Sequence, residues 1–191
     1  MTGRATAIRR ARPEDVPAMC AMVHDLAAYE KAPELCHLTE DQLRASLFGE
    51  HVAVYAHVAV TTKEEPGQGE LRAVTTKEES GQGGPRGEVE GEVVGMAIWF
   101  LNYSTWDGVH GIYLEDLYVR PEHRGSGLGK ALLVELAKEC AKNGWTRLSW
   151  WVLNWNAPAI GFYESIGAKP QDEWTTYRLS GPELAALAEE G

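Results

Sequence analysis

The stretch Tyr113-Leu-Glu-Asp-Leu-Tyr-Val119 is followed, after Arg120-Pro-Glu-His123, by Arg124-Gly-Ser-Gly-Leu-Gly129 and an apolar run. Aromatic and branched aliphatic residues in the first part favour a β-strand, and the segment with proline interrupts it. From Lys130 onward, apolar residues recur at helical spacing. This part of the chain therefore predicts a strand, a glycine loop and a helix, in that order.

The glycine loop has the composition of an anion-binding loop. Gly125, Gly127 and Gly129 have no Cβ and tolerate positive φ, so that several backbone N–H groups can converge on one anion. The first amides of the following helix lack intrahelical partners and lie at the positive end of its dipole. Arg124 adds a permanent cation at the mouth of the loop. An ordinary glycine-rich turn is the alternative, although the loop is neither a P-loop nor part of an early βαβ dinucleotide unit.

The pattern Arg124-x-x-Gly127-x-Gly129 after a strand resembles the pyrophosphate loop of the GNAT superfamily of acetyl-CoA-dependent N-acetyltransferases. Together with Tyr-Leu-Glu-Asp before it, Trp155-Asn-x-Pro-x-Ile-x-Phe-Tyr163 after it and Leu26-Ala-x-Tyr-Glu30, it is similar to the spermidine/spermine acetyltransferase branch. The resemblance covers nearly the whole chain apart from one insertion. It implies an α+β fold of mixed α/β layers, in which a mainly antiparallel sheet is flanked by helices. It also implies two parallel strands that splay apart, with acetyl-CoA in the gap.

Length and charge limit the possible functions. The 191 residues suit one domain spanning residues 1–191. The net charge is −10, from 28 acidic and 18 basic residues, which argues against a nucleic-acid partner and favours a cationic substrate. Acidity that only maintains solubility is the alternative explanation.

The cysteines and apolar segments predict a cytoplasmic protein without a metal site. Cys20, Cys36 and Cys140 form no metal-type pair, and we expect them to be reduced thiols. Cys20 and Cys140 fall in helical patterns, where they are expected to fill the core. No apolar run is long enough for a signal peptide or a membrane span.

A tandem duplication interrupts the chain. The sequence of residues 59–69 recurs almost unchanged at residues 73–83. Residues 61–92 contain too little apolar surface to offset their ordering entropy, so we expect a mobile hairpin extension or a disordered loop. We assign this insertion no function.

Periodicity and capping residues predict the remaining elements. A capping box at Thr39-Glu-Asp-Gln42 and a stop at Gly49 define one helix, and Asn156 can cap another. His51 and His57 are interpreted as surface or strand histidines. The predicted strands are 5–11, 51–60, 93–102, 113–119, 147–153 and 174–179, and the predicted helices are 13–30, 39–49, 131–142, 156–166 and 181–188.

The resemblance implies three groups of acetyl-CoA contacts: the glycine loop, the end of the strand before it, and the beginning of the helix at residue 156. A bulge in that strand is expected to expose backbone amides, because a strand paired on both sides has none to offer. Asn156 is either only a helix cap or also a contact to the CoA arm. The expected contacts are Leu117, Tyr118, Val119, Arg124, Gly125, Ser126, Gly127, Leu128, Gly129, Lys130, Asn156, Ala157, Pro158 and Ala159.

Acetyl transfer needs a proton acceptor for the amine and a proton donor for the departing thiolate. Tyr163 is the candidate acid by its match to the family pattern, because a phenol with a pKa of about 10 stays protonated until a thiolate forms. A core aromatic beside Phe162 is the alternative. Glu115 is the candidate acceptor, directly or through a water, or only an anchor for a second ammonium. Asp116 is expected on the opposite side of the strand, where it can hold structure.

An amine site is expected from acidic and aromatic residues. Glu30 and Glu115 can pair with ammonium groups, and aromatic rings can cover a methylene chain or a cation. The resemblance to the polyamine branch implies that Tyr29 and Glu30 contact the amine; a half-buried tyrosine and a solvated glutamate at a helix end are the alternative. Trp150 and Trp151 point to opposite faces if their strand is regular, so they do not both line the site. The expected substrate contacts are Tyr29, Glu30, Glu115, Ser149, Trp150 and Trp151.

The sequence therefore predicts transfer of the acetyl group of acetyl-CoA to a primary amine of a small polyamine or a lysine-like diamine such as thialysine. An acetyl-CoA sensor or scaffold without turnover and a peptide or protein acetyltransferase are the alternatives. The resemblance also implies a homodimer in which the C-terminal region contributes to the partner's site.

Overall fold

The computed structural model describes residues 6–61 and 91–190. The chain divides into two compact units, Met1–Trp151 and Val152–Gly191, and each is described by itself.

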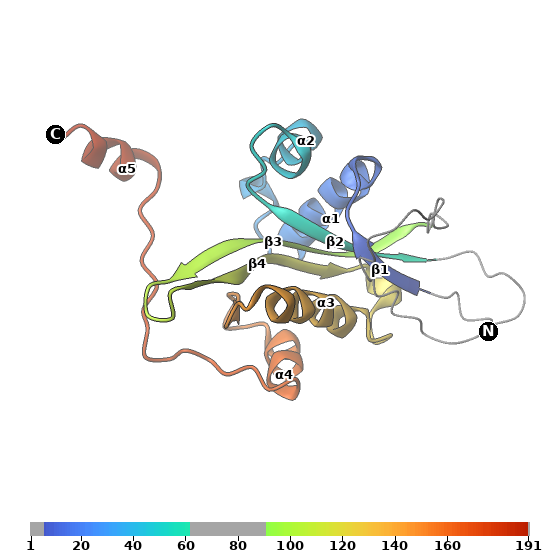
Figure 1. Cartoon of the computed structure of the whole chain (residues 1–191). Coiled ribbons are helices and arrows are strands. Elements are labelled where there is room, and N and C mark those ends of the chain that lie inside the picture. Colours follow the sequence, from blue (N-terminus) through green and yellow to red (C-terminus); the bar gives the residue numbers. More distant parts are fainter. Residues whose placement is uncertain (1–5, 62–90, 191) are drawn as a thin grey trace, which may run out of the picture. The chain divides into compact units, whose positions relative to one another are not determined.

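The first unit is built on one five-stranded sheet with the order β1-β2-β3-β4-β5 (Figure 1). The strands are β1 (Thr6–Arg10), β2 (Tyr55–Thr61), β3 (Val93–Ser104), β4 (Val109–Val119) and β5 (Leu148–Ser149). Successive pairs are antiparallel except β4 and β5, which are parallel. The predicted mainly antiparallel sheet is therefore confirmed, with one parallel pair at its edge.

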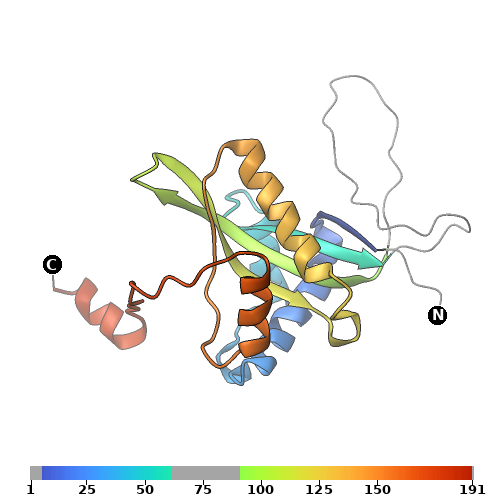
Figure 2. The same ribbon diagram turned by 90° about the horizontal axis from the view of Figure 1, so that it is seen from below.

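Helices cover both faces of this sheet. The short 3-10 helices η1 (Pro13–Asp15) and η2 (Pro33–Leu35) flank α1 (Val16–Tyr29), and α2 (Glu40–Phe48) follows them on the same face. On the opposite face, η3 (Pro121–His123) precedes α3 (Leu128–Asn143) (Figure 2). The predicted capping box begins α2: the Thr39 hydroxyl accepts the Gln42 N–H at 3.3 Å, and the Gln42 side chain accepts the Thr39 N–H at 2.9 Å.

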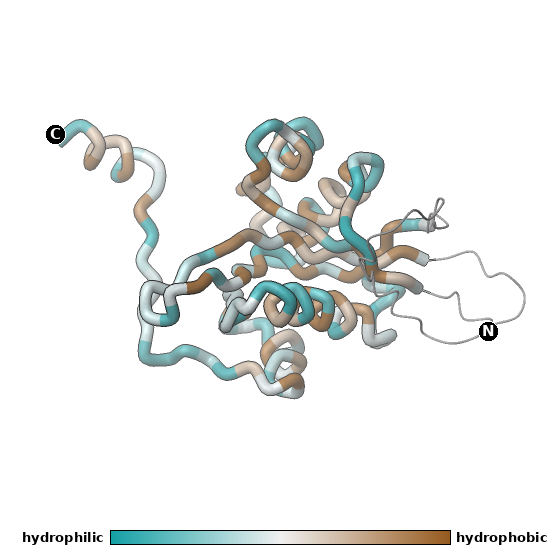
Figure 3. Tube along the Cα trace, viewed as in Figure 1, coloured by the Kyte–Doolittle hydropathy of each residue, from teal (hydrophilic) through white to brown (hydrophobic). Residues whose placement is uncertain are grey.

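The core follows from strand alternation, which sends every second side chain to the same face. Met96, Ile98 and Tyr118 point towards α1 and α2, where they pack with Met19 and Met22. Apolar positions on the strands appear brown in Figure 3. On the α3 side, Trp99 is buried, stacks on Tyr55 with centroids 4.7 Å apart, and donates its indole N–H to His57 Nδ1 at 3.2 Å. Burial, and secondarily Arg10, lowers the pKa of His57 to about 3, so this strand histidine stays neutral.

The strand predicted at 147–153 is much shorter in the structure. β4 pairs with β5 only through Ile112 with Leu148 and Tyr113 with Ser149. A strand ends where its neighbour diverges, because its backbone groups then lose their partners. The early separation of β4 from β5 agrees with the splay that the family resemblance implies.

The second unit contains α4 (Ala157–Ser165) and α5 (Gly181–Ala188). Asn156 caps α4 as predicted, since its side chain accepts the Ala159 N–H at 3.4 Å. The strand predicted at 174–179 is wrong: these residues are in neither strand nor helix. Their aromatic and β-branched residues favour an extended backbone, but a strand also needs a neighbouring strand to pair with.

The insertion joins two neighbouring antiparallel strands, β2 and β3. At its base, the Thr61 N–H donates to the Glu92 carbonyl at 2.9 Å. Most of the predicted loop, residues 62–90, lies outside the described residues.

Candidate functional site

The glycine loop leads into the beginning of α3. Gly125 and Gly127 have φ values of 75° and 86°, in the left-handed region that favours glycine. Gly127 is the N-cap residue, and no side chain caps the helix. The first turn therefore leaves the N–H groups of Leu128, Gly129 and Lys130 outside the intrahelical hydrogen bonds. The Ser126 hydroxyl donates to the His123 carbonyl at 2.6 Å and so folds back into the loop.

The space around the loop suits an anion. A Cβ added at Gly125 or Gly127 meets no atom within 4 Å, so no other part of the described chain fills the space on that side. The N-terminal end of the sixteen-residue α3 adds the positive end of its dipole. The loop can therefore bind a phosphate or diphosphate through its main chain.

The Arg124 side chain contacts β4 and the end of α1, and its role as a cation at the mouth of the anion loop stays a prediction. Its Nε donates to the Val119 carbonyl at 2.9 Å. Its guanidinium lies 5.4 Å from the ring centroid of Tyr118 and 5.4 Å from that of Tyr29. Two aromatic faces and a carbonyl attract this cation towards β4 and the end of α1.

β4 carries a bulge at Glu115. Ile98 of β3 lies opposite Asp116 and Trp99 lies opposite Leu114, so that Glu115 is the additional residue. The resemblance implied a bulge in this strand, and the register confirms it. No sequence pattern located it at Glu115.

Beyond the bulge, β4 presents main-chain groups to its open side. The Arg120 N–H donates to the Val94 carbonyl of β3 at 2.9 Å, so residues 116 and 118 also face β3. The amides of Leu117 and Val119 therefore face the other way, where β5 no longer pairs with β4. This open edge and the beginning of α3 lie at the two ends of the same short loop.

Asp116 is the carboxyl whose environment is most perturbed at this site. Its pKa is raised to about 6, first by burial and then by the nearby carboxylates of Glu115 and Glu30, in that order of importance. Glu30 ends α1, and burial raises its pKa as well. The predicted residues Glu30 and Glu115 thus both lie near enough to Asp116 for their charges to raise its pKa.

Simple alternation places the Asp116 side chain on the opposite face of the strand from Glu115, and for that reason the sequence predicted only a structural role for Asp116. The bulge interrupts that alternation. Asp116 shares a face with Tyr118, two residues further along, and Tyr118 belongs to the core beneath α1. No pattern in the sequence indicates that Asp116 is half-buried beneath α1, because simple alternation does not include the bulge.

The other predicted amine contacts lie near the point where β4 and β5 separate. Ser149 is the last residue of β5, and Trp150 and Trp151 follow it. Trp151 is 60% exposed and lies edge-on to Tyr113, with ring centroids 5.8 Å apart. Because both tryptophans follow the end of the strand, the argument that they point to opposite faces of a regular strand does not apply to them.

The second unit holds the predicted acid. Tyr163 is half-buried on α4, and its ring lies 5.3 Å from that of Phe162 at a tilt of 50°. The predicted CoA contacts Ala157, Pro158 and Ala159 form the first turn of the same helix. Their roles stay predictions.

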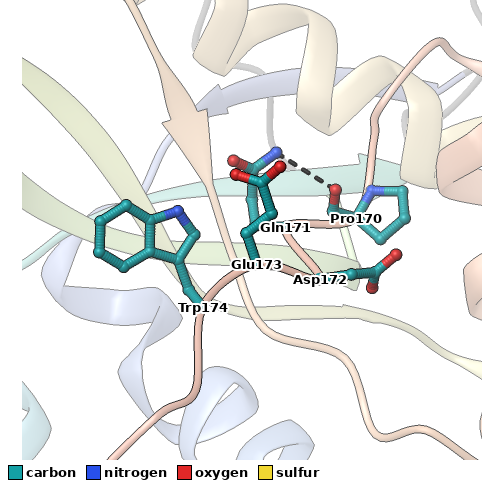
Figure 4. Close-up of a pocket in the computed structure, with 5 residues that line it drawn as sticks. All are labelled: Pro170, Gln171, Asp172, Glu173 and Trp174. Atoms are coloured by element: carbon teal, nitrogen blue, oxygen red, sulfur yellow. Dashed lines mark hydrogen bonds between the residues drawn. The ribbon is translucent and has the colours of Figure 1, made fainter.

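A shallow hollow lies on the second unit at Pro170, Gln171, Asp172, Glu173 and Trp174 (Figure 4). The Gln171 side chain donates to the Pro170 carbonyl at 3.3 Å, and the Trp174 N–H donates to the Gln171 carbonyl at 3.1 Å. All five residues are exposed. These contacts describe a surface turn, and we place no chemistry there.

The structure describes the ranges 6–61 and 91–190. They contain no group of three or more His, Cys, Asp or Glu side chains that could hold a metal ion. No helix in the same ranges is long and apolar enough to cross a membrane.

Comparison with known proteins identifies the family. Residues 42–168 match the sequence profile of the acetyltransferase (GNAT) family. The chain is 33% identical to a thialysine N-epsilon-acetyltransferase of Sus scrofa over 184 residues, which cover 95% of this chain and 96% of that protein. It is 32% identical to an L-ornithine N5-acetyltransferase of Arabidopsis thaliana, over 94% and 86% of the two chains.

Among solved structures, an integron cassette protein from the mobile metagenome of V. cholerae superposes with a TM-score of 0.70. It has 24% sequence identity and covers 98% of this chain and 100% of its own, so it supports the fold alone. The family profile covers most of the chain, and the relatives named above match it over nearly their whole lengths. The chain therefore belongs to the GNAT family of acetyltransferases.

Proposed function

We propose that the chain transfers the acetyl group of acetyl-CoA to a primary amine of a small molecule that carries a second cationic nitrogen. The observation that carries this proposal is the juxtaposition, on one strand, of an open main-chain edge and a group of carboxyls. Leu117 and Val119 offer amides at the end of β4, and Asp116 lies on the same strand, where the charges of Glu115 and of Glu30 at the end of α1 raise its pKa. An acyl donor and a cationic acceptor can therefore meet at this strand.

GNAT family members use acetyl-CoA as cosubstrate, and the residues present fit it. The first amides of α3 and the glycines before them supply N–H groups without a Cβ in the way. The open edge of β4 supplies further donors, which can polarise a carbonyl when they are held in place before the reaction. Bound acetyl-CoA supplies an activated acyl group, and the protein's part is to hold and orient it.

The carboxyls suit a protonated diamine. An aliphatic amine has a pKa of about 10 and arrives as an ammonium, which must lose a proton before it can attack. The raised pKa of Asp116, caused first by burial and then by Glu115 and Glu30, makes it a better proton acceptor than an ordinary aspartate. We propose that Asp116 or Glu115 accepts the proton, directly or through a water, and that Glu30 holds the second ammonium.

Tyr163 remains the proposed proton donor to the leaving thiolate. Its support is the match of residues 155–163 to the family pattern and its location on α4, whose first residue follows the capping Asn156. Donation by a positioned phenol lowers the cost of expelling a thiolate.

The relatives guide the choice of substrate. Thialysine and ornithine, which appear in the names of the two relatives above, each carry a terminal amine, an α-amine and a carboxylate. Polyamines share the spaced cationic nitrogens but lack the carboxylate. We therefore propose diamino acids and diamines as the substrate class, with polyamines as the second candidate.

The test is release of CoA thiol during incubation with acetyl-CoA and a panel of amines. The panel contains thialysine, ornithine, lysine, putrescine, spermidine, spermine, a lysine-containing peptide and, as a matched control, the monoamine propylamine. We expect release with diamines and much less with propylamine. Tight binding of acetyl-CoA without release for any amine would favour a sensor, and activity confined to the peptide would favour a protein acetyltransferase.

We also propose one catalytic domain that functions as a homodimer. The family match at residues 42–168 spans both compact units, which supports a single domain over residues 1–191. In the C-terminal segment, Trp174 is 72% exposed, Tyr177 is 91% exposed, and Leu184 and Leu187 are also exposed. Apolar exposure of this kind is typical of interfaces. Light scattering of the full chain and of a chain ending at residue 172 tests the proposal, which predicts a dimer only for the former.

The state of the cysteines leads us to propose that the protein is cytoplasmic. Cys20, Cys36 and Cys140 are free thiols, and Cys20 and Cys140 are buried as predicted. Free thiols are the usual state in a reducing compartment. Fractionation of cells that make the protein tests this localisation.

A further inference from the structure

Arg124 connects three parts of the first unit. Its main chain belongs to the loop before α3, and its N–H donates to the Pro121 carbonyl at 3.2 Å. Its Nε is held on the Val119 carbonyl at the end of β4. Its guanidinium contacts the ring of Tyr118 on β4 and the ring of Tyr29 in the last turn of α1.

The contact with Tyr29 matters because Glu30 follows directly. Glu30 is the C-cap residue of α1, and its N–H donates to the Leu26 carbonyl at 2.9 Å. The next residue, Lys31, has a φ of 63°, which is unusual for a residue with a side chain. The helix therefore ends at Glu30, directly after the tyrosine that the Arg124 guanidinium contacts.

The contacts of the Arg124 side chain lie on β4 and at the end of α1. The amides proposed to hold a diphosphate belong to Leu128, Gly129 and Lys130, whereas the guanidinium turns back to the Val119 carbonyl and two phenol rings. A guanidinium that contacts a carbonyl and two aromatic rings helps to hold those groups in place.

We propose that the Arg124 side chain is a positioning residue for the amine: by holding Tyr29 against the end of β4, it places Glu30 beside Asp116. This inference rests on the proposed function. Its consequence is that loss of the guanidinium weakens amine binding, while the main-chain anion site of the loop is retained.

The experiment compares steady-state kinetics of wild type, Arg124→Met, Tyr29→Leu and the double variant with the diamine that the panel identifies as best. Acetyl-CoA affinity is measured separately by calorimetry, and thermal unfolding confirms that each variant is folded. One exposed cation–π contact has a strength of about 0.5–1 kcal/mol, which corresponds to about a two- to fivefold change. We expect each single variant to raise KM for the amine by about threefold or more, with less than a twofold change in the Kd of acetyl-CoA.

The double variant separates a shared effect from two independent ones. If Arg124 acts through Tyr29, the double variant raises the amine KM no more than the larger single effect. Arg124→Lys retains a cation without the planar fork, and we expect it to recover part of the amine KM. Arg120→Met is the matched control, because the Arg120 Nε donates to the Val93 carbonyl at 3.3 Å instead, and its amine KM is expected to stay within twofold of wild type.

Two results overturn the inference: a raised Kd of acetyl-CoA in Arg124→Met with an unchanged amine KM, or single effects that multiply in the double variant. Either result leaves the proposed function intact, because both require turnover. A wild-type protein that acetylates no amine contradicts the proposed function itself, and the inference falls with it.

Discussion

Replacement of Asp116 by asparagine removes the carboxyl with the most perturbed pKa at the site. The pKa of this group is raised from 3.8 to about 6, first by burial and then by Glu115 and Glu30. A shift of about two units corresponds to at most about 3 kcal/mol between protonated and ionised forms. Because Asp116 is only half-buried, the measured value is expected to fall below this limit.

The direction with pH follows from linkage. In the folded protein the carboxyl binds its proton more tightly than in the unfolded chain, so its contribution to stability is fully present below pH 4 and is lost as pH rises through 6. Asparagine carries no such charge. The free energy of unfolding of Asp116→Asn, relative to wild type, is therefore expected to rise by about 1–3 kcal/mol between pH 4 and pH 8.

Urea unfolding at half-unit pH intervals measures this difference. Asp172→Asn provides the baseline, since it removes an equal charge from an exposed turn in the other unit. Glu115→Gln removes the second cause of the shift and is expected to move the pH midpoint of the Asp116 effect downward. If the difference between Asp116→Asn and wild type stays constant from pH 4 to pH 8, the reasoning about this carboxyl is refuted.

The remaining predictions concern the proposed acid, the proposed acceptor, a helix end and the insertion. Tyr163→Phe is expected to lower kcat roughly a hundredfold while leaving the Kd of acetyl-CoA unchanged, and an unchanged kcat removes Tyr163 from its role. The kcat/KM of wild type is expected to fall below about pH 6, and Asp116→Asn is expected to lose that acidic limb if Asp116 accepts the proton. Gly144→Ala places a side chain at φ 67° at the end of α3 and is expected to lower stability by about 1 kcal/mol, or about 2–4 °C in Tm; an unchanged Tm contradicts the assigned conformation. Replacement of residues 62–90 by a short turn is expected to leave a folded protein by circular dichroism, because it joins neighbouring antiparallel strands; loss of folded protein contradicts this.

Local features of the fold were predictable because their causes are local. The capping box at Thr39, the stop at Gly49 and the cap at Asn156 each depend on a few adjacent residues, and the structure has all of them. The strand, loop and helix that the opening stretch predicted correspond to β4, the glycine loop and α3.

Features that depend on distant partners were not predictable. Residues 147–153 and 174–179 are rich in the aromatic and branched residues that favour strands, yet only Leu148–Ser149 forms one, because pairing requires a neighbouring edge at the right distance. The orientation of Arg124 depends on Tyr29, almost a hundred residues earlier in the chain, which no local pattern connects to it.

The candidate site shows the same division. Composition indicated the anion loop, and the family resemblance together with the position of Glu115 on the strand pointed to Glu30 and Glu115, but the bulge decided which neighbouring carboxyl faces α1. A bulge reverses the facing of every later residue in its strand relative to simple alternation. Asp116 therefore became a candidate only once the register of β3 and β4 was known.

The central claim is that free main-chain amides at the end of β4 and the beginning of α3 hold acetyl-CoA. Residue-resolved amide hydrogen exchange, with and without saturating acetyl-CoA, tests it most directly. The account predicts new protection at Leu117, Val119, Leu128, Gly129 and Lys130, where the structure leaves N–H groups directed away from β3 or uncapped. Acetyl-CoA binding with unchanged exchange at these amides, and protection elsewhere, would contradict it.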